Sequence, residues 1–188
     1  TGDMTLTSIG AASVEVANQN QNVNIKGSTA TALNLTFDTV GTTVGTTITP
    51  ITVNLAAGTA NAATSLAITA NNAQVTMSET TASAATTSAT IAATGKNQLT
   101  FAATDAASLT SVSVTGAGSV DLSVTNPLSA VTTLTATDGG LKATVTNTTA
   151  TAATITTGAG VDTISAVGTG VKAINTGAGN DVVTIATS

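Results

Sequence analysis

The sequence predicts an all-β protein, a parallel β-solenoid, and three observations support that prediction. Short segments in which apolar and polar residues alternate recur in pairs along the chain, which is the pattern of half-buried strands. Apolar residues of successive pairs recur at intervals of about 20 residues, as repeat proteins require. Residues 157–188 contain glycine-rich units of nine residues that are in phase with the upstream strands. An antiparallel meander or sandwich with the same hairpin spacing is the alternative.

Eight pairs of short strands are expected, rich in β-branched residues and bounded by Gly, Asn and Ser. The chain shows no helical periodicity. The expected pairs are 14–16 with 23–25, 33–37 with 51–55, 66–68 with 75–77, 90–91 with 99–101, 112–114 with 120–124, 134–136 with 143–145, Ile155 with Ile164, and Ile174 with Val183.

Two ladders of inward-facing residues follow from these pairs. One runs through Ile68, Ile91, Val114, Ala136, Ile155 and Ile174, and the other through Met77, Phe101, Leu122, Ala143, Ile164 and Val183. Spacing in the first ladder falls from 23 to 19 residues, which indicates a solenoid whose last turns become regular. We therefore expect irregular solenoid rungs over 1–152, continuous with β-roll turns over 153–188. The segment 38–50 (DTVGTTVGTTITP) breaks the rhythm and is predicted to be a loop projecting from the second rung.

Composition narrows the possible functions. The chain has no His, Cys or Tyr, so the usual nucleophile and base pairs are missing and we expect no enzyme. Four basic residues and a net charge of −5 make no basic patch, so nucleic-acid binding is not expected. No apolar run approaches the roughly 20 residues of a membrane span. The chain begins with Thr1, and we expect a segment of a longer protein.

Three consecutive units in the tail share the frame x-G-x-G-x-[D/K]-x-[I/V]-x, beginning at Thr157, Val167 and Thr176, so the period is nine residues with one residue inserted. In a roll of such units two make one turn, so the first and third stack on one edge. Asp162 and Asp181, 19 residues apart, then lie one above the other, and Lys172 lies on the opposite edge. Ca²⁺ takes several oxygen ligands, which stacked carbonyls and carboxylates supply. Because Lys172 is itself positively charged, no ion is predicted on the edge where it lies. The alternative is that Gly and Asp are ordinary turn residues.

These units resemble the repeats-in-toxin (RTX) family, whose motif is G-G-x-G-x-D-x-U-x with U a large aliphatic residue. They depart from it at the first glycine of every unit and at the aspartate of the middle unit, where Lys172 stands. The resemblance implies a Ca²⁺ site whose ligands are the side chains of Asp162 and Asp181 and carbonyls around Gly158, Gly160, Gly177 and Gly179. Asp105, Asp121 and Asp138 are interpreted as turn residues, with a further ion at Asp121 or Asp138 as the alternative.

The whole chain is similar to the lattice-forming segments of surface-layer (S-layer) proteins of Gram-negative bacteria, which are rich in Ala and Thr and nearly free of aromatic residues and Cys. The segment 8–16 (SIGAASVEV) is similar to an element that recurs in them. The resemblance implies type I secretion, calcium-dependent folding after export, and an extracellular position at the cell surface. It further implies assembly with copies of itself into a lattice, with cell-surface polysaccharide as a partner through another domain.

Two other functions compete with this one. A stalk or ligand-binding segment of a large secreted RTX adhesin shares the export route and the repeats. An ice-binding solenoid is suggested by T-x-T pairs centred on Leu134, Val145 and Ile155, whose threonines point outward. That function needs the pairs in one flat file, and their uneven spacing, about 21 residues between some and 11 and 10 between others, disfavours it.

Overall fold

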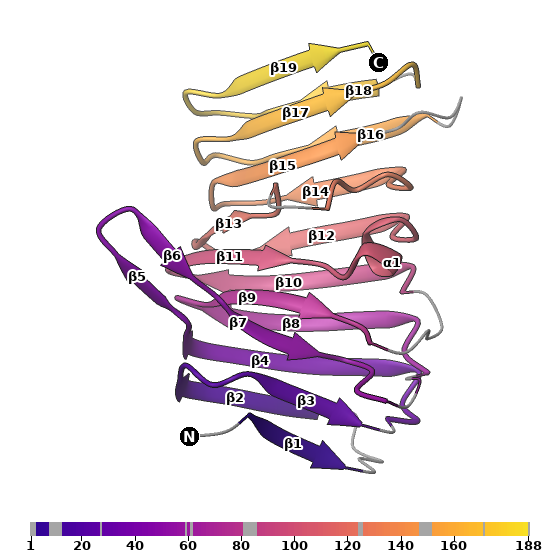
Figure 1. The fold of residues 1–188 in the computed structure, drawn as a ribbon. Coiled ribbons are helices and arrows are strands. Elements are labelled where there is room, and N and C mark those ends of the chain that lie inside the picture. Colours follow the sequence, from indigo (N-terminus) through magenta and orange to yellow (C-terminus); the bar gives the residue numbers. More distant parts are fainter. Residues whose placement is uncertain are drawn as a thin grey trace.

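The chain winds into a parallel β-solenoid of about seven turns, each of about 22 residues (Figure 1). This computed structural model describes residues 3–7, 13–26, 28–58, 60, 62–80, 86–123, 126–146, 152–170 and 172–187. Every strand pair within the two large sheets is parallel, so the predicted fold class is confirmed and the antiparallel alternative is wrong for these sheets. Residues 8–12 of the segment 8–16 lie outside the described residues.

Each turn contributes one strand to each of two sheets. The nine-stranded sheet contains, in spatial order, β1 (Met4–Thr7), β3 (Val23–Lys26), β7 (Ile51–Asn54), β9 (Gln74–Ser78), β11 (Lys96–Thr100), β13 (Ser119–Asp121), β15 (Leu141–Thr146), β17 (Thr163–Val167) and β19 (Val182–Ala186). The eight-stranded sheet contains β2 (Ser13–Gln19), β4 (Ala32–Val40), β8 (Ser65–Asn71), β10 (Ser88–Thr94), β12 (Ser111–Thr115), β14 (Thr133–Ala136), β16 (Ala153–Thr156) and β18 (Lys172–Asn175). All eight expected strand pairs are therefore present.

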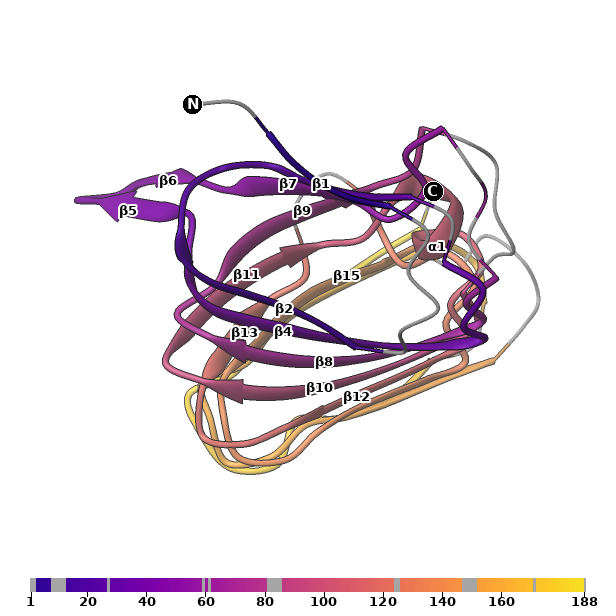
Figure 2. The same ribbon diagram turned by 90° about the horizontal axis from the view of Figure 1, so that it is seen from below.

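The core lies between the two sheets, which face each other in the view along the solenoid axis (Figure 2). Alternate residues of each strand point inward, because successive side chains of a strand lie on opposite faces. In β8 the inward residues Leu66 and Ile68 are buried while Ala67 and Thr69 are exposed. The two phenylalanines, Phe37 and Phe101, are fully buried. Small aliphatic residues fill the remainder, since each turn covers only its neighbours.

The register of the eight-stranded sheet matches the first predicted ladder from Ile68 as far as Ala136. The next step is wrong, because Ile155 lies beside Leu134 rather than beside Ala136. The last step, from Ile155 to Ile174, is confirmed. An error of two residues keeps every side chain on the correct face of the sheet.

A second error of two residues occurs in the nine-stranded sheet. The prediction placed Leu122 beside Phe101. Asp121 is paired with Gln98, which puts Leu122 in line with Leu99. The later steps of this ladder, from Ala143 to Ile164 and on to Val183, are confirmed.

The segment 38–50 projects from the solenoid, as predicted, but it contains strands rather than being a loop throughout. β4 continues to Val40, and the chain then forms an antiparallel hairpin of β5 (Thr42–Val44) and β6 (Thr47–Thr49) that projects from the solenoid (Figures 1 and 2). Gly41 and Gly45, both with positive φ, allow the sharp changes of direction. Val44 at its tip is 76% exposed.

One short helix interrupts the strands, although no helical pattern was predicted. It is α1 (Ala103–Ala106), a single turn at the corner that follows β11. A helix of one turn is too short to show a 3.6-residue periodicity. Among the described residues no helix has the length and apolar character needed to cross a membrane.

Candidate metal site

One corner of the solenoid carries a column of inward-facing residues, one from each turn, just before or at the start of a strand of the nine-stranded sheet. In the last turns this column holds two aspartates above apolar residues. Its members from β11 onward are Asn97, Val120, Leu141, Asp162 and Asp181. Asp162 is fully buried, like Val120 and Leu141 at the same position. The tail therefore places carboxylates where earlier turns have aliphatic side chains.

Hydrogen bonds along this column link each turn to the one before it. Asp181 Oδ1 accepts the backbone N–H of Asp162 at 3.0 Å. Asp162 Oδ1 accepts the backbone N–H of Leu141 at 2.7 Å. Asn97 does the same for the N–H of Ala73 at 3.0 Å. The structure thus brings the two predicted aspartates together across adjacent turns.

The second carboxylate oxygen of Asp162 has no such partner. Asp162 Oδ2 is buried and accepts no hydrogen bond. A buried carboxylate oxygen without a donor or a cation is energetically costly, because its hydration has been lost. A cation placed between the two turns would compensate both carboxylates.

The predicted glycines allow the backbones of adjacent turns to touch at this corner. A Cβ on Gly179 would overlap the carbonyl oxygen of Gly160, and a Cβ on Gly177 would overlap that of Gly158. Gly177 and Gly179 also have φ of +70° and +143°, which L side chains rarely adopt. The carbonyl of Gly158 accepts the N–H of Ala178 at 2.9 Å, so this carbonyl already forms a hydrogen bond between adjacent turns.

These residues fit a calcium ion. A hard cation accepts carboxylate and carbonyl oxygens as ligands, and a carbonyl has two lone pairs, so one that accepts an N–H can still bind an ion. Within the described part of the chain, no group of three or more His, Cys, Asp or Glu side chains gathers in one place. Ligands beyond the two carboxylates would therefore be backbone carbonyls, as the sequence predicts. Ca²⁺ binding by this corner stays a prediction.

The opposite edge of the roll carries a positive charge of its own. Lys172 Nζ donates to the carbonyl oxygens of Gly170 at 3.1 Å and Gly168 at 3.3 Å. These are the two glycines of the middle unit, and Lys172 holds the position that aspartate holds in the units on either side. The ammonium therefore satisfies turn carbonyls that a metal ion would otherwise bind, which supports the prediction that this edge holds no ion.

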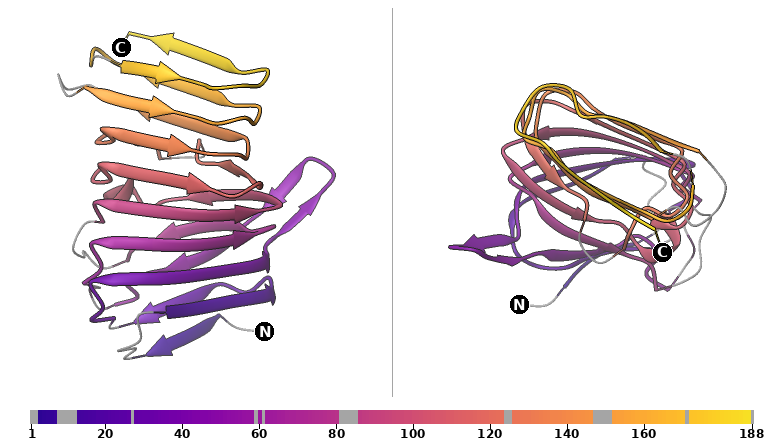
Figure 3. Two further views of the ribbon diagram at one scale, coloured as in Figure 1. Left: turned by 180° about the vertical axis from the view of Figure 1, so that it is seen from behind. Right: turned by 90° about the horizontal axis from the view of Figure 1, so that it is seen from above.

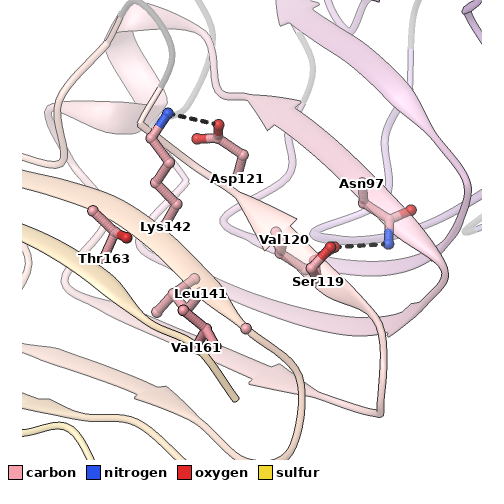
Figure 4. A pocket seen from close by; sticks show the side chains of 9 residues that line it. Asn97, Ser119, Val120, Asp121, Leu141, Lys142, Val161 and Thr163 are labelled. Carbon is pink, nitrogen blue, oxygen red and sulfur yellow. Dashed lines mark hydrogen bonds and ion pairs between the residues drawn. The ribbon is translucent and has the colours of Figure 1, made fainter. Parts of the chain in front are cut away.

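Asp121 differs from the tail aspartates in the direction of its side chain. One residue later than the column position, it points outward while its neighbour Val120 points inward (Figure 4). Its Oδ2 forms a 3.1 Å ion pair with Lys142, and its Oδ1 accepts the N–H of Ser123 at 2.9 Å. The pair borders a shallow hollow of about 250 Å³. Asp121 follows Gly118 by three residues, whereas Asp162 follows Gly160 by two, and this extra residue turns the Asp121 carboxylate away from the corner.

Asp138 and Asp105 also lie away from the corner column. Asp138 is exposed in the turn after β14. Asp105, interpreted from the sequence as a turn residue, is instead fully buried on α1, where its Oδ1 accepts the N–H of Thr86 at 3.0 Å. Its Oδ2 is buried without a partner. Burial raises the pKa of the Asp105 carboxyl above its ordinary value of 3.8, against the opposing hydrogen bonds from Thr86.

Comparisons with known proteins identify no relative. A scan against protein-family models finds no matching family, and searches of curated proteins and of solved structures find no match.

Proposed function

We propose that this chain is a calcium-stabilised structural segment of a bacterial cell-surface layer, folded after export and assembled with copies of itself. The observation that carries the proposal is the aspartate stack. Asp162 is fully buried with one unpartnered carboxylate oxygen, and Asp181 lies on it in the next turn. A structure that leaves such a carboxylate uncompensated is stabilised by a cation that binds the folded state.

Calcium dependence gives this segment a folding switch that acts on export. When an ion site exists only in the folded chain, the free energy of ion binding becomes free energy of folding. The chain would fold weakly where calcium is scarce and firmly where it is abundant. The lack of cysteine is consistent with an exported protein stabilised by an ion instead of by disulfides.

The experiment is a comparison of the purified chain in calcium and in a chelator. Circular dichroism measures folding, and sedimentation with electron microscopy measures assembly. We expect the β signal to strengthen with calcium and ordered sheets or polymers to follow. A chain equally folded and unassembled in both conditions would refute the proposal.

A second candidate, the adhesin segment, is favoured by the projecting hairpin of β5 and β6. Rigid scaffolds commonly carry binding contacts on such projections. Val44 and Ile48 are exposed on this hairpin. Calcium-dependent folding into a monomer that binds cells or glycans, with no lattice, would favour the adhesin over the surface layer.

A further inference from the structure

The outer face of the eight-stranded sheet is made almost entirely of small hydroxyl side chains from β8 to β16. None of the outward-facing residues of these five strands is charged or aromatic. They are Ser65, Ala67, Thr69, Asn71, Ser88, Thr90, Ala92, Thr94, Ser111, Ser113, Thr115, Thr133, Thr135, Thr154 and Thr156. Figure 3 (left) looks onto this sheet, where the strands lie evenly one above another.

The hydroxyl groups form straight columns, because the parallel register aligns them. One column is Ser65, Ser88, Ser111, Thr133 and Thr154. The next is Ala67, Thr90, Ser113, Thr135 and Thr156. Neighbouring strands are about 4.8 Å apart, and alternate residues of one strand are roughly 6.4–6.8 Å apart. The face is therefore a two-dimensional grid of hydroxyl and methyl groups.

The register also explains the uneven spacing of the T-x-T pairs along the chain. The pairs centred on Leu134 and Ile155 belong to β14 and β16 and lie side by side, with both central residues buried. The pair centred on Val145 belongs to β15, in the other sheet. The chain alternates between sheets, so two of the three pairs lie side by side on one face and the third lies on the other sheet.

A ladder of threonines fixes one margin of this grid. The hydroxyls of Thr87, Thr110 and Thr132 each donate to the carbonyl of the threonine in the preceding turn, at 3.3, 3.0 and 3.0 Å. Threonine is also stiff about its first side-chain torsion. Such an array has little conformational entropy left to lose when it binds a surface.

The outer face of the nine-stranded sheet also carries hydroxyl columns, for example Thr144, Ser165 and Thr184, but charged side chains interrupt this face. Its outer positions carry Lys96, Asp121 and Lys142, and the last two form an ion pair. From β8 to β16 the outer face of the eight-stranded sheet is free of charged side chains, whereas Glu15 and Asp38 lie at outer positions of β2 and β4.

The small, uncharged side chains of this face favour some classes of partner over others. Protein interfaces depend on aromatic, Met and Arg anchors and are depleted in Ser and Ala, so a second copy is a poor fit. A protein partner would also not require residues in regular columns. A crystalline solid does require regular columns. Ice presents oxygen atoms in a periodic array whose repeats are similar in size to the spacings of the hydroxyl columns. We propose that this face binds ice, with the threonine and serine columns holding ordered water against the lattice.

The test measures thermal hysteresis and adsorption to growing ice, using the whole chain in whichever buffer gives the folded β spectrum. Thr133→Lys places a long charged side chain in the first column, and Thr90→Lys does so in the second column, in another turn. Thr144→Lys is the matched control, because it alters a T-x-T pair on the nine-stranded sheet. All four proteins are compared by circular dichroism.

We expect the unaltered chain to shape ice crystals and to produce thermal hysteresis. The folded variants at Thr133 and Thr90 should lose most of that activity, and Thr144→Lys should retain it. A folded chain without activity overturns the proposal, and so does an equal loss in all three variants. Loss of self-association in Thr133→Lys, without ice activity in the parent, would instead assign the face to contacts between copies. Because folding is measured separately, failure here is distinguishable from failure of calcium-dependent assembly.

Discussion

Replacing Asp162 by asparagine separates the two roles of its carboxylate. Its Oδ1 accepts the N–H of Leu141, and its Oδ2 is the buried oxygen to which we assign an ion. Asparagine keeps an acceptor for the N–H but removes the charge. Alanine removes both, and leaves the N–H of Leu141 without a partner inside the corner.

The magnitudes follow from these contacts. An unsatisfied buried N–H costs about 1–3 kcal/mol, so in chelator Asp162→Ala should be less stable than Asp162→Asn by about that much. Asp162→Asn should be at least as stable as the parent in chelator, because it no longer buries an uncompensated charge. Calcium at 100 times its dissociation constant stabilises the parent by about 2.7 kcal/mol. The asparagine variant should gain little of this.

Urea denaturation of each protein, in calcium and in chelator, measures the free energies of unfolding. Asp121→Asn is the matched control, because that carboxylate points outward and is paired with Lys142. An exposed pair contributes about 0–1 kcal/mol, and the control should keep its full response to calcium. An Asp162→Asn chain that gains as much from calcium as the parent would refute the ion site.

Three further outcomes test other parts of the structure. Lys172→Asp replaces the ammonium that two turn carbonyls accept with a carboxylate, so titration calorimetry should count one more calcium ion per chain. Burial raises the folded-state pKa of Asp105, so its contribution to stability is present in acid and is lost as pH rises above 3.8 through the folded value; urea midpoints of Asp105→Asn should not show this fall. Gly158→Ala should abolish folding in circular dichroism, because its Cβ overlaps the Thr137 carbonyl. Gly45→Ala at the open hairpin tip should cost only about 1–2 kcal/mol.

The sequence predicts the faces of the strands well and their pairing less well. Alternation decides which residues point inward, and it correctly places Leu134 and Ile155 in the core. It does not decide which inward residue of one turn meets which of the next, because a shift of two residues leaves the alternation unchanged. Both ladder errors, at Ile155 and at Leu122, are of this kind.

The candidate site was predictable because its spacing is fixed by the turn length. Asp162 and Asp181 occupy the same position in units that stack, and the register of β17 and β19 aligns them. Burial of Asp105 was not predictable from alternation, because it lies on the helical turn α1. The alanines around it favour helix and were the available signal.

Parallel stacking also determines how the molecule would respond to tension. β19 is held by β17, and β18 by β16, so a pull on the C-terminal end detaches one coil before it loads the next. Each coil released there frees 19 residues, roughly 65 Å of extended chain at about 3.4 Å per residue. The hydrogen bond from the N–H of Asp162 to Asp181 Oδ1 crosses the boundary between two of these coils. This hydrogen bond, and an ion shared by the two carboxylates in the proposed site, would therefore both resist separation of these coils.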